Sequence, residues 1–208
     1  MLTLQTALTF FGISILLGLT PGPDNLFVLM QSATQGRKAG MLVVFGLSTG
    51  IIVHTCAIAM GLAALFAASA TAFLVLKFVG AAYLAYLAWG AFHAPVGDTA
   101  GNSAPVMRPA QLYLRGIIMN LTNPKVVLFF LALLPQFVSA ERGAIAPQFF
   151  QLGAIFIVAT LITFGGIAWF AASVGQRLRR SAQAQRWLNR SAATVFALLA
   201  AKLALAQR

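Results

Sequence analysis

Long runs without a charged residue dominate this chain and limit the folds open to it. Such runs cover residues 1–23, 25–36, 39–76, 78–97, 126–140 and 143–176. Only 8% of the residues are charged and 60% are apolar, whereas a soluble domain has about 25% charged residues. A surface so poor in polar groups cannot face water, so the sequence predicts an integral membrane protein.

The length of the apolar runs predicts the number of spans. A helix needs about 20 apolar residues to cross a bilayer, so we expect an all-α protein with six transmembrane helices. These are expected near 4–30, 41–66, 70–92, 112–138, 148–172 and 189–205. The last span is short and begins beside Arg190, so five spans are the alternative. Residues 1–20 lack the basic n-region of a signal peptide and are expected to be a retained span.

A polar segment divides this single transmembrane domain, residues 1–208, near its midpoint. Residues 93–111 are rich in proline and glycine and are expected to form a loop. The first half, 1–92, and the second half, 112–208, would then contain three spans each.

Basic residues outnumber acidic ones by 14 to 3, and their positions predict the orientation. Nine lie in or beside the first, third and fifth loops: Arg37, Lys38, Arg108, Arg115, Arg177, Arg179, Arg180, Arg186 and Arg190. Four lie on the opposite side: Lys77, Arg142, Lys202 and Arg208. Because Lys and Arg favour the cytoplasmic side, both termini are expected outside the cytoplasm, in a bacterial inner membrane. The basic 173–190 segment has a second interpretation, as a helix on an anionic membrane surface.

Several function classes lack the residues that they require. Cys56 is the only cysteine, which excludes an internal disulfide and a thiol relay. His54 and His93 stand alone, without the spacing of a metal site, and no nucleophile–base set of an enzyme is present. Membrane topology accounts for the net charge of +11 without nucleic acid. We therefore expect a protein that is not an enzyme, has no cofactor or bound metal, and is surrounded by lipid.

The two halves share a segment that contains proline. Residues 19–29 (LTPGPDNLFVL) resemble residues 121–131 (LTNPKVVLFFL). With three spans in each half, such halves have opposite orientations and form an inverted 3+3 repeat. The prolines and one glycine are expected to interrupt the first and fourth helices. These residues are Pro21, Gly22, Pro23 and Pro124. Paired interruptions indicate a transporter binding site, while a simple kink in each helix is the alternative.

Asp24 and Lys125 each follow one of these prolines and are the only charges expected deep within the spans. A charge inside the membrane costs at least about 2.5 kcal/mol, so it is usually functional. We expect a substrate site for a zwitterion formed by these two residues with Asn25 and Asn123. In it, Asp24 would hold an ammonium group and Lys125 a carboxylate; the alternative is a neutralising structural pair. Asp24 is also the first candidate for proton coupling, and His54 is the second.

Small residues are expected to mark close helix contacts. Gly46 and Gly50 share one face of the second span with His54, and Gly153 occupies the position in the second half that corresponds to Gly46. All three glycines are predicted to bring helices together. His54 on this face is either a packed histidine or a proton relay.

The segments Thr20-Pro21-Gly22-Pro23-Asp24-Asn25 and Asn123-Pro124-Lys125 resemble those of the LysE/RhtB family of bacterial amino-acid exporters. The resemblance covers the length, the six apolar segments and the central loop. It implies a secondary transporter that exports amino acids or their derivatives from the cytoplasm by proton antiport, with a small amino acid and protons as its partners. An exporter of metal ions or other small solutes from the same superfamily is the alternative. A homo-oligomer is also compatible with the sequence.

Overall fold

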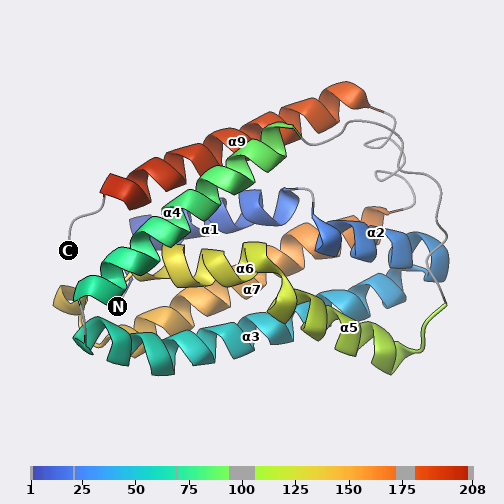
Figure 1. Ribbon diagram of the computed structural model, residues 1–208. Helices are drawn as coiled ribbons and strands as arrows, with labels where there is room; N and C mark the ends of the chain where they lie inside the picture. The colour runs from blue at the N-terminus through green and yellow to red at the C-terminus, as the bar shows by residue number, and fades with distance from the viewer. Residues whose placement is uncertain (1, 21, 69, 94–105, 172–180, 206–208) are drawn as a thin grey trace.

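A computed structural model describes residues 2–20, 22–68, 70–93, 106–171 and 181–205, and every regular element in these ranges is helical (Figure 1). The expected all-α class is therefore confirmed for the described part of the chain. Predictions for Pro21, for most of the central loop, for residues 172–180 and for Arg208 lie outside the described residues.

The helices follow the apolar runs of the sequence. Those of the first half are α1 (Leu4–Leu19), α2 (Pro23–Gln35), α3 (Arg37–Ala68) and α4 (Ala70–Phe92). Those of the second half are α5 (Pro109–Thr122), α6 (Pro124–Leu128), α7 (Ile145–Phe170) and α9 (Ala182–Leu205). Between α6 and α7 lie a π-helix (Phe129–Leu133) and two 3₁₀ helices (Leu134–Phe137 and Ala140–Arg142).

Two of the described helices, α3 and α7, are long and apolar enough to cross a membrane. The number becomes four if α1 with α2, bent by 65°, and α5 with α6, bent by 58°, each count as one span. Six spans and the inverted repeat therefore stay predictions.

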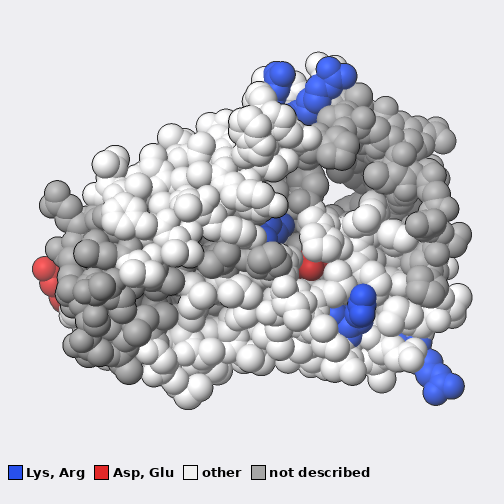
Figure 2. All heavy atoms as spheres, viewed as in Figure 1, with Lys and Arg blue, Asp and Glu red and all other residues white. Residues whose placement is uncertain are grey.

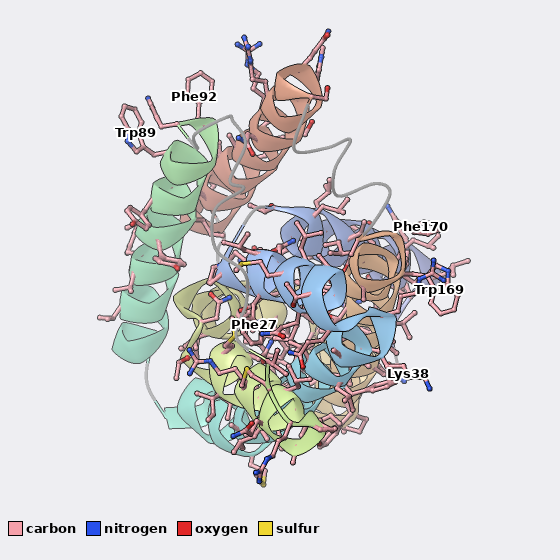
Figure 3. All side chains as sticks on the ribbon, turned by 90° about the vertical axis from the view of Figure 1, so that its right-hand side faces the viewer. Phe27, Lys38, Trp89, Phe92, Trp169 and Phe170 are labelled. Atoms are coloured by element: carbon pink, nitrogen blue, oxygen red, sulfur yellow. The ribbon has the colours of Figure 1, made fainter. Side chains whose placement is uncertain are left out.

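α3 and α7 run antiparallel and are the central pair of the larger helix group. Gly40 of α3 lies beside Ala168 of α7, and at the other end Gly153 of α7 packs directly on Thr55 of α3. α5 packs along α3, and α1 packs along α7, each in parallel. The contacting pairs are Gly46–Gly116 and Gly50–Asn120 for α3 with α5, and Phe10–Phe156 and Gly18–Thr163 for α1 with α7. α4 and α9 pack on each other beside this group (Figure 3).

Two apolar clusters form the core. One contains Phe10, Phe129 and Phe156, whose rings lie 5.2 to 6.3 Å apart. The other contains Leu47 and Phe164, which come from α3 and α7. The candidate site described below lies where these two clusters meet.

Close contact between α3 and α5 depends on glycine, which leads to a first prediction. A methyl group on Gly46 would overlap the backbone carbonyl oxygen of Tyr113, whereas one on Gly61 of the same helix meets nothing within 4 Å among the described residues. We expect Gly46→Ala to lower the free energy of unfolding by about 1–3 kcal/mol. Gly61→Ala is expected to leave it unchanged or raise it by up to about 1 kcal/mol. Thermal unfolding of the purified protein in detergent compares them; equal melting temperatures would contradict the prediction.

Candidate functional site

The first helix break places a carboxylate at the start of α2. α1 ends at Leu19, and the backbone N–H and hydroxyl of Thr20 both donate to the Leu16 carbonyl, at 3.0 and 2.8 Å. α2 begins with Pro23 as its first residue, after Gly22 as its N-cap. Asp24 therefore lies in the first turn of α2, where the positive end of the helix favours an anion. Its side chain is only 2% exposed.

The second break places an ammonium group at the start of α6. Asn123 is the N-cap of α6, and its Oδ1 accepts from the Lys125 backbone N–H at 3.0 Å. Pro124 follows as the first residue of the helix, a position that needs no N–H donor. Lys125 is buried although it carries a charge.

Side chains of the second break bond to the first break. Asn123 Nδ2 donates to Asp24 Oδ2 at 2.8 Å. Lys125 Nζ donates to the carbonyl oxygens of Leu17 and Thr20, at 3.2 Å each. These carbonyls lie at the end of α1, where helical partners run out and a positive charge is favourable. The bonds from Lys125 were not predicted from the sequence, but a signal exists: Pro21 has no N–H to donate to the Leu17 carbonyl four residues earlier.

A cavity of about 20 Å³ lies between the two breaks, with room for roughly one water molecule. It is lined by Leu17, Gly18, Asp24, Leu47, Asn120, Lys125, Val126, Phe156, Thr160 and Phe164. Asp24 and Lys125 are both described residues, and no ion pair joins them although they line the same cavity. Figure 2 shows a basic and an acidic patch near each other around the middle of the face in view.

The remaining predicted site residues lie at different distances from this cavity. Asn25 Nδ2 donates to the Gly18 carbonyl at 2.6 Å, so Asn25 also bonds to the end of α1. Gly22 faces Lys125, because an added Cβ would lie 3.2 Å from its Nζ. His54 does not line the cavity: its Nε2 lies 3.4 Å from the Asn120 carbonyl oxygen, and its ring centroid 5.4 Å from that of Phe130.

The sequence did not predict that two further polar residues, Asn120 and Thr160, line the cavity. Asn120 is 3% exposed, and no described residue donates to its Oδ1. Thr160 of α7 is buried as well. Asn120 precedes Asn123 by one helical turn, and a second amide in an otherwise apolar run is the signal that identifies it.

Comparisons with known proteins cover nearly the whole chain. The model of the LysE type translocator family matches residues 15–207. The chain is 32% identical to the homoserine/homoserine lactone efflux protein of Salmonella typhimurium, over 93% of each chain. It is 33% identical to the protein of the same name from Salmonella typhi, again over 93% of each chain. It is also 31% identical to an uncharacterized membrane protein of Vibrio cholerae over 80% of each chain. No solved structure matches the chain. With a family match over almost its full length, the chain belongs to the LysE type translocators, a family of membrane transporters.

Proposed function

We propose that this protein exports a small amino acid or amino-acid derivative from the cytoplasm by proton antiport. The observation that carries the proposal is the pair of buried charges, Asp24 and Lys125, which line one cavity without an ion pair between them. An ammonium group and a carboxylate on one ligand complement these charges. The names of the Salmonella relatives support homoserine or its lactone as the first compounds to test.

The two halves, 1–92 and 112–208, form an inverted repeat joined by the 93–111 segment. The helix directions support this proposal. α1 is parallel to α7, α7 is antiparallel to α3, and α3 is parallel to α5, so α1 and α5 run in opposite directions. α1 of the first half thus packs along α7 of the second half, and α5 of the second half packs along α3 of the first half. In such transporters the halves move against each other around a fixed site, which is how the two sides of the membrane would reach the cavity in turn.

The basic end of the molecule faces the cytoplasm. In Figures 1 and 2, basic residues gather at the end where α5 and α9 begin. α1 begins and α9 ends at the other end (Figure 1). By the positive-inside rule, both chain termini are then extracytoplasmic, and the membrane is the bacterial inner membrane. A reporter enzyme that is active only outside the cytoplasm is expected to be active when it is fused after Leu205. Activity of a reporter that works only in the cytoplasm would contradict this orientation.

Export is tested most directly in cells. A strain that overexpresses the protein is expected to release homoserine faster and to tolerate more of it than the same strain with an empty vector. Untargeted measurement of the medium identifies other exported metabolites, and the Lys125→Met variant serves as an inactive control. If neither homoserine nor any other amino acid leaves the cells faster, the proposed export is wrong.

A further inference from the structure

Polar and aromatic contacts join the two halves at the end of the molecule where α1 begins. We propose that the bond between Arg142 and Thr6, with the aromatic cluster beside it, is the extracytoplasmic gate of the transporter. These contacts hold this end together while the site faces the cytoplasm, and they break when the site opens to the outside. This inference rests on the proposed function and its orientation, and it names the residues that control access to the site.

Hydrogen bonds connect the start of α1 to the second half. Arg142 Nη1 donates to Thr6 Oγ1 at 3.1 Å, and the Leu2 backbone N–H donates to Gln151 Oε1, also at 3.1 Å. From Thr6, α1 runs toward Leu17, which lines the cavity. With a rise of about 1.5 Å per residue, Thr6 lies about 16 Å from Leu17 along the helix. The bond from Arg142 therefore lies well outside the substrate site, near one end of the molecule.

The position of Arg142 is fixed within the second half. Its Nη2 donates to the Phe137 carbonyl at 3.2 Å. Gln148, fully buried near the start of α7, holds the segment that carries Arg142. Its Nε2 donates to the Ser139 and Gly143 carbonyls at 2.8 and 3.1 Å, and its Oε1 accepts from the Ser139 N–H at 3.1 Å. Arg142 is thus tied to α7, whereas its acceptor belongs to the first half, so the bond joins two segments that the proposed movement separates.

A series of neighbouring aromatic rings leads from the cavity to this bond. Phe156 lines the cavity, and its ring centroid lies 6.3 Å from that of Phe10. The Phe10 ring lies in turn 5.1 Å from that of Phe137, whose carbonyl accepts from Arg142. All three rings are buried. A polar substrate loses its hydration in a buried apolar constriction, so these rings oppose its passage toward the extracytoplasmic end.

The opposite end of the molecule, where α5 begins, has a related but uncharged connection (Figure 1). Met107 lies just before α5, as Leu2 lies just before α1, and its backbone N–H also donates to a glutamine Oε1 of the other half, that of Gln35, at 3.1 Å. Gln31 bonds to Gln35 and donates to Met107 Sδ at 3.7 Å. These bonds join neutral groups, whereas Arg142 supplies a charged donor, which is about twice as strong. The empty site is therefore expected to face the cytoplasm more often, as loading of an exporter requires.

Labelling from each side of the membrane tests the gate without any substrate. Cys56, the only cysteine, is replaced by alanine, and Thr160→Cys introduces one thiol at the cavity. A membrane-impermeant maleimide is applied to spheroplasts for the extracytoplasmic side and to inverted membrane vesicles for the cytoplasmic side. With Arg142→Met added, the labelling rate from the extracytoplasmic side is expected to rise by about tenfold, while the rate from the cytoplasmic side does not rise.

Further variants assign the effect to this bond. Thr6→Val removes only the acceptor and is expected to act as Arg142→Met does, and the two together are expected to add little more. Arg142→Lys keeps a donor and is expected to restore most of the parent's labelling pattern. Gln35→Met acts at the other end and is expected to slow labelling from the extracytoplasmic side. Arg115→Met removes an exposed charge of α5 and is expected to label as the parent does. If Arg142→Met is not recovered in the membrane, Thr6→Val replaces it.

The outcomes distinguish this inference from the proposed export. Faster labelling from both sides in Arg142→Met would indicate a loosened protein, and unchanged labelling from the extracytoplasmic side would show that the bond does not control access. Either result, or a rise from the cytoplasmic side alone, overturns the inference. Because labelling needs no substrate, absence of amino-acid counterflow in the wild type together with the expected labelling overturns the proposed export and supports the gate.

Discussion

Replacing Lys125 with methionine is expected to abolish transport and to destabilise the folded protein by about 3 kcal/mol or more. The substitution keeps most of the side-chain volume but removes the donors to the Leu17 and Thr20 carbonyls. Those carbonyls would remain buried at the end of α1 without a partner. Asp24 would also lose the only basic side chain that lines its cavity among the described residues, and a buried uncompensated charge is costly.

Lys38→Met is the matched control for this variant. Lys38 is exposed at the start of α3, and its side chain points away from the helices in Figure 3. Its replacement is expected to change neither the melting temperature in detergent nor the rate of homoserine counterflow, because an exposed charge contributes little. A Lys125→Met protein with the wild-type melting temperature would show that the bonds to α1 are not structural. One with wild-type transport would exclude Lys125 from the site.

Hydrophobicity located the long helices but not their ends. The expected 70–92 span coincides with α4, and the expected 148–172 span nearly matches α7 (Ile145–Phe170). α9, by contrast, begins at Ala182, seven residues before the expected start at 189. The early part of α9 contains Arg186, which precedes the expected span, and Arg190 lies at the start of that span. A helix can continue beyond the hydrocarbon layer, so hydropathy predicts the apolar segment rather than the full helix.

The 112–138 segment is more irregular than its sequence indicated. The sequence predicted one interruption, at Pro124, but after α6 the chain continues as a π-helix and then a 3₁₀ helix. Pro135 lacks the N–H that would bond to the Leu131 carbonyl, so the regular hydrogen-bond pattern cannot continue past it. This local effect was available in the sequence, but the apolar composition alone concealed it.

The composition of the candidate site was partly predictable because charge and proline are conspicuous in an apolar sequence. The structure brings Asp24, Asn123 and Lys125 together, as the sequence pattern indicated, although their roles stay predictions. Asn120 was not predicted, since its place in the cavity depends on the contact between α5 and Gly50 of α3. Contacts between helices far apart in sequence are not visible in one sequence, and they determine which polar residues reach the cavity.

Replacing Asp24 with asparagine is expected to abolish proton-driven movement of homoserine and to weaken homoserine binding by about a hundredfold. The amide has nearly the same shape, and its oxygen can still accept from Asn123 Nδ2. Membrane insertion and folding are therefore expected to be retained. The amide carries no charge to attract an ammonium group and no proton to release between the two sides of the membrane. Transport is measured in proteoliposomes with an imposed pH gradient, and substrate-free thermal unfolding reports the folding.

Glu141→Gln is the control for this variant, because Glu141 is exposed in the 3₁₀ helix Ala140–Arg142, away from the cavity. It is expected to transport as the wild type. If Asp24→Asn still responds to the pH gradient, Asp24 does not carry the proton, and His54→Gln becomes the next variant to measure. His54 contacts the Asn120 backbone and not Asp24, so a proton carried there would reach the substrate only through a change in α5. The Asp24 and His54 variants thus decide whether proton coupling occurs at Asp24 in the substrate site or at His54 through α5.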